Sequence, residues 1–213
     1  MPVVYLLRHG QASADAVDYD ALSSTGREQS RLLGVELLAR QVKVAAVRSG
    51  TLNRQRDTAA EAVAAAGIDL APVQDPRWNE YDHMELLQGH PLSRDASVQQ
   101  ILDAALHRWT ADADATGAWT AFRDGALAAL RETADGLGAG EAALVFTSAG
   151  IIAAICASLI DPEGAGFVAL NRMVVNASIT KLVHGRGGTR LLTFNDHAHF
   201  ESGDDRRALL TYR

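Results

Sequence analysis

Residues 3–10 read VVYLLRHG, and this stretch decides the fold. The apolar run, rich in β-branched and aromatic residues, predicts a buried strand that ends at Arg8, His9 and Gly10. Gly10 permits a sharp turn there, because it has no side chain to restrict the backbone. Open α/β sheets bind ligands at the carboxyl ends of their strands, so Arg8 and His9 are candidate functional residues. A guanidinium can bind two phosphate oxygens while an imidazole nitrogen approaches the phosphorus.

The chain after this stretch alternates between strands and helices, which predicts a mostly parallel α/β sheet with right-handed crossovers. The expected helices cover residues 25–40, 51–66, 97–109, 118–137 and 151–160. The further strands are expected at residues 42–47, 71–73, 142–146, 174–183 and 189–194. A glycine-rich connection joins the last two, which predicts an antiparallel edge on the sheet.

The composition is that of a globular protein in one domain. The chain has 213 residues, 47% of them hydrophobic and 22% charged, which fits a single domain over residues 1–213. The pattern is less regular over residues 81–117, which we interpret as an inserted lid or specificity region. The uncharged stretch 142–160 divides into a strand, a turn and a helix, so we expect it to be buried in the fold and not to cross a membrane.

Charge and cysteine content exclude several classes of function. The net charge is -6 and no basic run appears, which argues against a nucleic-acid partner. Cys156 is the single cysteine, so neither a disulfide framework nor a thiolate metal cluster is expected. The first residues lack the basic and apolar regions of a signal peptide, which predicts a cytoplasmic protein.

A second polar cluster, residues 48–59 (RSGTLNRQRDTA), also lies where a strand leads into a helix. Backbone amides at the start of a helix favour anions. A cation such as Arg54 near this end opposes the helix dipole, which suggests a functional role. The alternative is that Arg54 is an ordinary solvated side chain.

Three spaced motifs resemble the histidine phosphatase superfamily, also called the phosphoglycerate mutase-like family. They are Leu7-Arg8-His9-Gly10, Leu22-x-x-Thr25-Gly26-x-x-Gln29 and Arg54-x-x-x-Thr58-Ala59. The resemblance covers about residues 3–200 and implies a three-layer α/β/α sandwich with a phosphohistidine intermediate and neither metal nor cofactor. It makes His9 the nucleophile and assigns Arg8 and Arg54 to the phosphoryl oxygens.

Glu80 matches the family position of the acid that protonates the leaving group. Trp78 and Tyr81 are close to it in sequence and could desolvate the carboxyl group, which favours its protonated form. Asp82, the residue used in some branches of the family, is a rival, and His83 is a weaker one. Glu80 could instead be a solvated loop carboxylate.

The chain departs from the family at residues 148 and 149, where Ser148 replaces a second histidine and Ala149 a glycine. Losing one hydrogen-bond donor to the transition state can cost about a hundredfold in rate. Ser148 can still donate through its hydroxyl group, and the backbone amides of Ser148 and Ala149 could face an anion. Alternatively, Ser148 only caps a helix. Gln11 is a further possible pocket residue.

A metal site is the remaining alternative for a cluster near the C-terminus. Asp196, His197 and His199 have ligating side chains, but two histidines on a loop are weak evidence, and we expect no metal.

The sequence therefore predicts a metal-independent phosphatase that acts on a small phosphorylated metabolite or a phosphoprotein. The alternatives are a degenerate member that binds a phosphorylated ligand without turnover and, less favoured, a phosphoglycerate mutase. Substrate identity and oligomeric state are left open.

Overall fold

The computed structural model describes residues 1–13, 20–87, 97–111, 117–161, 165–201 and 204–212. Its centre is a six-stranded sheet in the order β3-β2-β4-β1-β5-β6. The strands are β1 (Val3–Arg8), β2 (Val44–Ser49), β3 (Val73–Gln74), β4 (Ala142–Thr147), β5 (Ile179–Gly185) and β6 (Gly188–Asp196). The first four are parallel, whereas β5 is antiparallel to β1 and β6 to β5. The predicted sheet, mostly parallel with an antiparallel edge, is confirmed.

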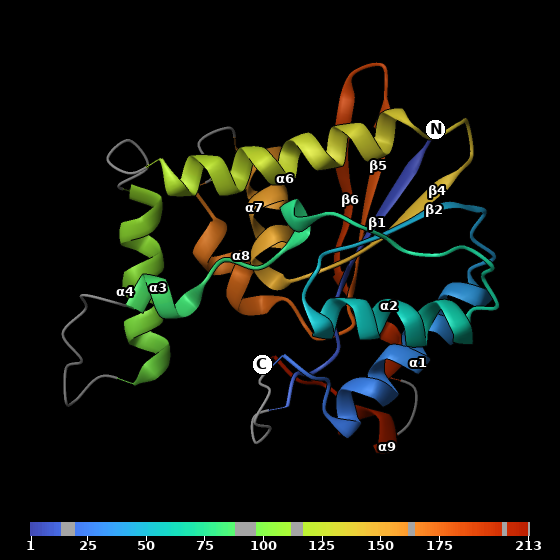
Figure 1. Ribbon diagram of the computed structural model, residues 1–213, viewed down its shortest axis with the longest axis horizontal. Helices are drawn as coiled ribbons and strands as arrows, with labels where there is room; N and C mark the ends of the chain where they lie inside the picture. Colours follow the sequence, from blue (N-terminus) through green and yellow to red (C-terminus); the bar gives the residue numbers. More distant parts are fainter. Residues whose placement is uncertain (14–19, 88–96, 112–116, 162–164, 202–203, 213) are drawn as a thin grey trace.

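Helices cover both faces of the sheet, so the sheet is the middle one of three layers (Figure 1). The helices are α1 (Ser24–Ala39), α2 (Asn53–Ala65), α3 (His83–Leu87), α4 (Val98–Ala111), α6 (Ala118–Asp135), α7 (Ala149–Ile160), α8 (Phe167–Met173) and α9 (Asp204–Arg207), with 3-10 turns η1 (Pro76–Trp78) and η2 (Ala198–Phe200). Alternate side chains of β1 point to opposite faces. Val4 and Leu6 pack in the core under α6 and α7, whereas Tyr5 and Leu7 pack under α1 and α2. β1 is thus buried on both faces, which explains its continuous apolar sequence.

The region expected to be an insert contains α3 and α4, and an aromatic cluster packs it against α6 and α8. The rings of this cluster lie with centroids 4.6–6.4 Å apart in the contacting pairs, and they belong to Tyr81, Trp109, Trp119, Phe122 and Phe167. Tyr81 follows Glu80 directly, so this packing also fixes the loop that carries the candidate acid.

The prediction of a strand over residues 174–183 was wrong for its first part. The strand begins only at Ile179, and residues 174–178 form a buried turn in which Ala177 has a φ of 55°. This turn bonds to the end of β1, since the His9 carbonyl accepts from the Ala177 amide at 3.2 Å and from Asn176 Nδ2 at 3.1 Å. Hydropathy cannot distinguish such a turn from a buried strand. The sequence prediction also missed α3, α8 and α9.

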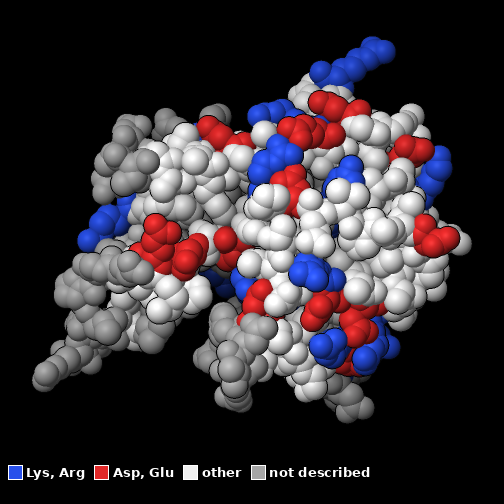
Figure 2. Space-filling model, in the orientation of Figure 1, with Lys and Arg blue, Asp and Glu red and all other residues white. Residues whose placement is uncertain are grey.

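Charges of both signs are mixed on the face shown in Figure 2. The pair Arg27–Glu61, with an N–O distance of 3.2 Å, is an example of the ion pairs on α1 and α2. Such exposed pairs contribute at most about 1 kcal/mol each. None of the described helices is both long and apolar enough to cross a membrane. Residues 142–160 instead form β4 and α7, as expected.

Candidate active site

His9 follows the last residue of β1 and is buried. Its Nδ1 lies 2.7 Å from the carbonyl oxygen of Gly10. A carbonyl only accepts, so Nδ1 carries the hydrogen and Nε2 keeps its lone pair. Burial, and then the positive charges of Arg8 and Arg54, lower the pKa of His9 well below its usual 6.5. The ring is therefore neutral at neutral pH and presents Nε2 as a nucleophile.

Gly10 is needed for close backbone approach. A Cβ atom at Gly10 would lie 2.3 Å from the Gly26 carbonyl oxygen at the start of α1. The Gly10 amide also donates to Thr58 Oγ1 on α2 at 2.9 Å. The three motifs noted in the sequence therefore meet at Gly10, where the contact with Gly26 leaves no room for a Cβ atom.

Arg54 reaches His9 from the first turn of α2. Its Nε donates to His9 Nε2 at 3.3 Å, and its Nη1 lies 2.6 Å from Asp20 Oδ1. The other oxygen of Asp20 accepts a hydrogen bond from the Asn53 amide at 2.6 Å. Asp20 thus balances both the Arg54 charge and the positive end of α2, which explains how a cation is tolerated near the start of this helix.

Arg8 is held differently, by main-chain oxygens near the end of the chain. Its guanidinium donates to the carbonyl of Val174 and, at 3.5 Å, to that of Tyr212. The acceptors of these two bonds are neutral main-chain oxygens. Arg8 and Arg54 both act on the pKa of His9 and of Glu80, which places the four charged or titratable groups in one site.

Glu80 lies in the loop after η1 and is half-buried. Its Oε2 accepts from the Gly150 amide at 3.2 Å and its Oε1 from the Tyr81 amide at 3.2 Å. Desolvation raises the pKa of Glu80, and its effect exceeds the opposing effects of the Gly150 hydrogen bond and of the two arginines. The carboxyl group therefore stays protonated to a higher pH than a solvated one and can donate a proton.

Ser148 is the N-cap residue of α7, yet its side chain accepts no hydrogen bond from the helix. It is fully buried, and Gln55 Nε2 donates to its Oγ at 2.8 Å. The alternative interpretation, in which the Ser148 side chain only caps the helix, is therefore wrong. Ala149 follows as the first residue of α7 and is buried at 6% exposure.

The structure gives the two remaining candidates other partners. Asp82 is exposed, and its Oδ1 accepts from the amides of Met84 and Glu85 at 2.8 and 3.1 Å, so it caps α3. Gln11 uses its side-chain oxygen to accept from Ser23 Oγ at 2.9 Å, next to the start of α1.

The histidines near the C-terminus contact protein groups. His197 Nδ1 lies 2.6 Å from the Asn195 carbonyl oxygen, and Asp196 forms an ion pair with Arg40 at 2.7 Å. His199 is buried against Phe200, and burial lowers its pKa to about 4. Within the described ranges, no group of three or more potential ligands is arranged to hold a metal ion.

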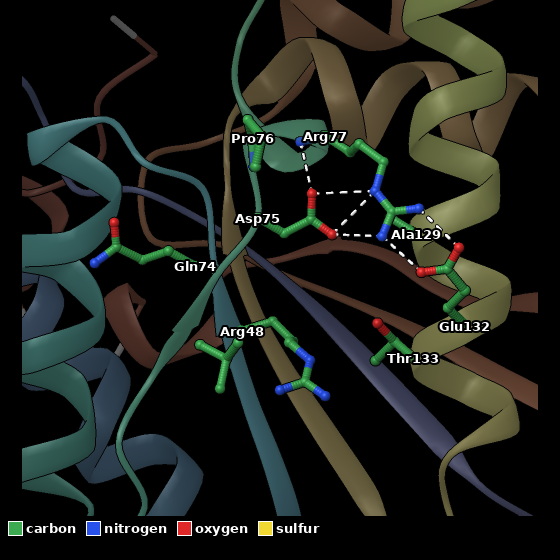
Figure 3. Close-up of a pocket in the computed structure, with 9 residues that line it drawn as sticks. Arg48, Gln74, Asp75, Pro76, Arg77, Ala129, Glu132 and Thr133 are labelled. Carbon is green, nitrogen blue, oxygen red and sulfur yellow. Dashed lines mark hydrogen bonds and ion pairs between the residues drawn. The ribbon is translucent and has the colours of Figure 1, made fainter.

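A separate groove of about 290 Å³ lies between β2, β3, η1 and α6 (Figure 3). Arg48 points toward it, while the Arg77 guanidinium is bound by Asp75 at 2.7 Å and by Glu132 at 2.6 Å. Its two arginines and two carboxylates balance in charge. The groove contains none of the candidate site residues, so its size alone does not make it the active site.

Three residues of the site were not predicted from the sequence: Asp20, Gln55 and Gly150. Gln55 follows Arg54 directly, so its place at the helix start was a usable signal. The contacts of Asp20 and Gly150 depend on how distant loops pack, and no local pattern indicates them.

The comparisons with known proteins identify the family and the fold. The family model described as "Histidine phosphatase superfamily (branch 1)" matches residues 4–197. The chain resembles YhfR of Bacillus stearothermophilus with a TM-score of 0.71 and 21% identity, covering 93% of this chain and 99% of that one. It also resembles a mycobacterial glucosyl-3-phosphoglycerate phosphatase, with a TM-score of 0.60 and 24% identity over 92% and 99% of the two chains. A phosphoserine phosphatase of Entamoeba histolytica gives a TM-score of 0.64 at 15% identity, over 93% and 99%.

The search of curated proteins found no match. The family model nevertheless covers nearly the whole chain and includes the two arginines, His9, Glu80 and Ser148. This chain belongs to the histidine phosphatase superfamily, branch 1.

Proposed function

We propose that this protein is a metal-independent phosphatase that hydrolyses a phosphomonoester through a phosphohistidine on His9. The observation that carries the proposal is the state of the His9 ring. Its Nδ1 hydrogen is bound to the Gly10 carbonyl, and its Nε2 lone pair faces the Arg54 guanidinium. A nucleophilic nitrogen beside a cation fits attack on an anionic phosphate ester.

The first half of the reaction transfers the phosphoryl group to the enzyme. Arg54 leaves His9 Nε2 and, with Arg8, neutralises the phosphoryl oxygens. Nε2 then bonds to phosphorus while the bond from phosphorus to the ester oxygen breaks. That oxygen takes the proton of the Glu80 carboxyl group and departs as an alcohol.

The second half releases phosphate. A water molecule bonds to phosphorus, and the bond between phosphorus and Nε2 breaks, which returns its electron pair to the imidazole. The Glu80 carboxylate accepts the proton of the water and is ready for the next cycle.

The substrate we propose is a small phosphorylated metabolite or a phosphoprotein. The phosphoserine and glucosyl-3-phosphoglycerate phosphatases that share the fold are named for small phosphomonoesters, which favours the metabolite.

The test is hydrolysis of 4-nitrophenyl phosphate in EDTA by the wild type, His9→Ala and His107→Ala. His107 is exposed on α4 and serves as the matched control. Wild type and control should be equally active, and His9→Ala should lose all activity above background. Rapid quench and intact-mass measurement should find a phosphoryl adduct that His9→Ala lacks. Full activity in His9→Ala would refute the mechanism.

A degenerate binding protein is the second candidate, favoured by the serine at position 148. It predicts that vanadate or phosphate binds to the wild type while no ester is hydrolysed. The same experiment therefore separates the two functions.

A further inference from the structure

Gln55 lies behind the candidate site, fully buried on the first turn of α2. The Gln55 side chain fits in this place because residue 50 is a glycine: a Cβ atom at Gly50 would lie 1.9 Å from Gln55 Oε1. A buried amide that side chains and backbone surround so closely has a defined orientation, and its hydrogen bonds show which one.

The partners of Gln55 fix the direction of every hydrogen bond. The Trp78 carbonyl, 2.9 Å away, can only accept, so the atom facing it is Nε2. Oε1 faces the Leu52 amide, which can only donate, at 3.4 Å. The second hydrogen of Nε2 then goes to Ser148 Oγ at 2.8 Å. Ser148 is therefore an acceptor toward Gln55.

The hydroxyl hydrogen of Ser148 must consequently point elsewhere. In the described parts of the chain it has no acceptor, although the side chain is fully buried. An unsatisfied buried donor is costly, and such groups occur where a ligand completes them. Ser148 is also next to the nucleophile, because β1 pairs with β4 up to Arg8 and Thr147, and the His9 amide donates to the Thr147 carbonyl at 2.9 Å.

We infer that Gln55 is a positioning residue for Ser148. By occupying an acceptor lone pair of the hydroxyl group, Gln55 directs the hydrogen toward a phosphoryl oxygen bound at His9. The Gln55–Ser148 pair thereby supplies the transition-state donor at the position where the family resemblance leads us to expect histidine. The inference rests on the proposed phosphatase function and names a residue that the family motifs do not include.

The Gln55 bonds can be removed while Trp78 remains anchored. Thr147 Oγ1 also donates to the Trp78 carbonyl, at 2.6 Å, so that carbonyl stays satisfied without Gln55. Gln55→Met keeps the length of the side chain and removes both donors. Ser148→Ala removes the hydroxyl group alone.

The chain offers a matched control in Gln29, a second fully buried glutamine. Its Nε2 donates to one carbonyl, of Leu209 at 2.7 Å, and to one hydroxyl, of Thr211 at 2.8 Å. The chemistry is that of Gln55, but neither partner is Ser148. Gln29→Met therefore reports what the loss of a buried amide does to the fold.

The experiment is a double-mutant cycle on kcat and KM with 4-nitrophenyl phosphate, with thermal melting of each variant. We expect Ser148→Ala to lower kcat about a hundredfold, as for one transition-state donor, and to change KM little. Gln55→Met should lower kcat about tenfold or more in the wild type and have almost no effect in the Ser148→Ala background. Gln29→Met should have the same effect on kcat in both backgrounds.

The inference would be overturned if the losses of kcat in Gln55→Met and Ser148→Ala simply multiply in the double variant. It would also be overturned if Ser148→Ala does not lower kcat. If Gln55→Met does not fold, Gln55→Glu replaces it. Its carboxylate would draw the Ser148 hydrogen toward itself, so the loss should again be larger with Ser148 present than in the Ser148→Ala background. The proposed phosphatase function is tested separately by His9→Ala. If His9→Ala loses activity while the effects of Gln55→Met and Ser148→Ala on kcat are independent, only the role of Gln55 is refuted.

Discussion

Asp75 and Glu80 lie at the two ends of η1, in opposite environments. Asp75 faces the groove of Figure 3, where the Arg77 side chain binds it, and this hydrogen bonding lowers the pKa of Asp75 below its usual 3.8. Glu80 accepts hydrogen bonds from two backbone amides and forms no ion pair with the described residues. Desolvation raises its pKa above 4.5. The anionic form of the carboxyl group is thus favoured at one end of η1, and the protonated form is favoured at the other.

The largest effect on kcat is expected from a substitution at Glu80. Glu80→Gln removes the transferable proton, so kcat for an alkyl phosphate should fall at least about a hundredfold. The loss should be much smaller for an aryl phosphate, whose leaving group needs no proton. Asp75→Asn is the matched control and should leave the ratio of the two rates unchanged. Equal losses for both substrates in Glu80→Gln would remove Glu80 from the role of acid.

The pH dependence should show both titrating groups. His9 must be neutral, so activity is lost as the pH falls through the lowered pKa of His9. Glu80 must be protonated, so activity is lost as the pH rises through its raised pKa. The profile of kcat/KM is then bell-shaped, and Glu80→Gln should remove the alkaline limb alone. An alkaline limb that persists in this variant would belong to another group.

A third variant tests the position of the Glu80 carboxyl group without changing its chemistry. A Cβ atom at Gly150 would lie 2.1 Å from Glu80 Oε1 and 2.6 Å from the Tyr81 ring. Gly150→Ala should therefore displace the carboxyl group and lower kcat for the alkyl phosphate about tenfold or more, since misplacing a catalytic group by about 1 Å can cost a hundredfold. The measurement is the ratio of alkyl to aryl phosphate hydrolysis, and an unchanged ratio would show that Glu80 tolerates the displacement.

These environments also show how much the sequence can predict. The sheet was predictable because β1 and β4 are short apolar runs that end at turn residues, and the order of motifs placed His9 and Arg54 together. The acid was predictable only as a position, because the desolvation that raises the pKa of Glu80 depends on how distant segments pack around it. Gly150, whose amide contacts the carboxyl group, is 70 residues away in sequence. The sequence allowed Ser148 to donate through its hydroxyl group, but it could not predict how that group is oriented. Its partner Gln55 lies on another helix, and the sequence cannot show that the hydroxyl group turns away from the helix it begins.

At the other end of η1, the expected effects are on stability. Asp75→Asn keeps a side-chain oxygen that can cap η1 but removes the charge next to Arg77. Because both side chains are partly exposed, at 21% and 36%, we expect a loss of about 1 kcal/mol or less. The melting temperature should then fall by at most roughly 2–4 °C for a chain of this size. Since the folded-state pKa of Asp75 is lowered, its contribution is present above the unfolded pKa and lost as the pH falls through the folded one. A difference that persists in high salt would contradict an ionic origin.

The smallest effect on activity is expected from a substitution at Gly125. This residue of α6 faces Arg77 of η1, whereas Gly150 of α7 faces Glu80. Among the described residues, a Cβ atom at Gly125 would meet only Arg77 Cγ, at an ordinary contact distance of 4.0 Å. Gly125→Ala should therefore stabilise α6 by about 0.5–1 kcal/mol, the helix-propensity difference between the two residues. Thermal melting measures the gain, and the ratio of alkyl to aryl phosphate hydrolysis should stay that of the wild type. If Gly125→Ala changed that ratio as Gly150→Ala does, the Asp75 end of η1 would be coupled to the acid, and the two ends could not be treated as separate environments.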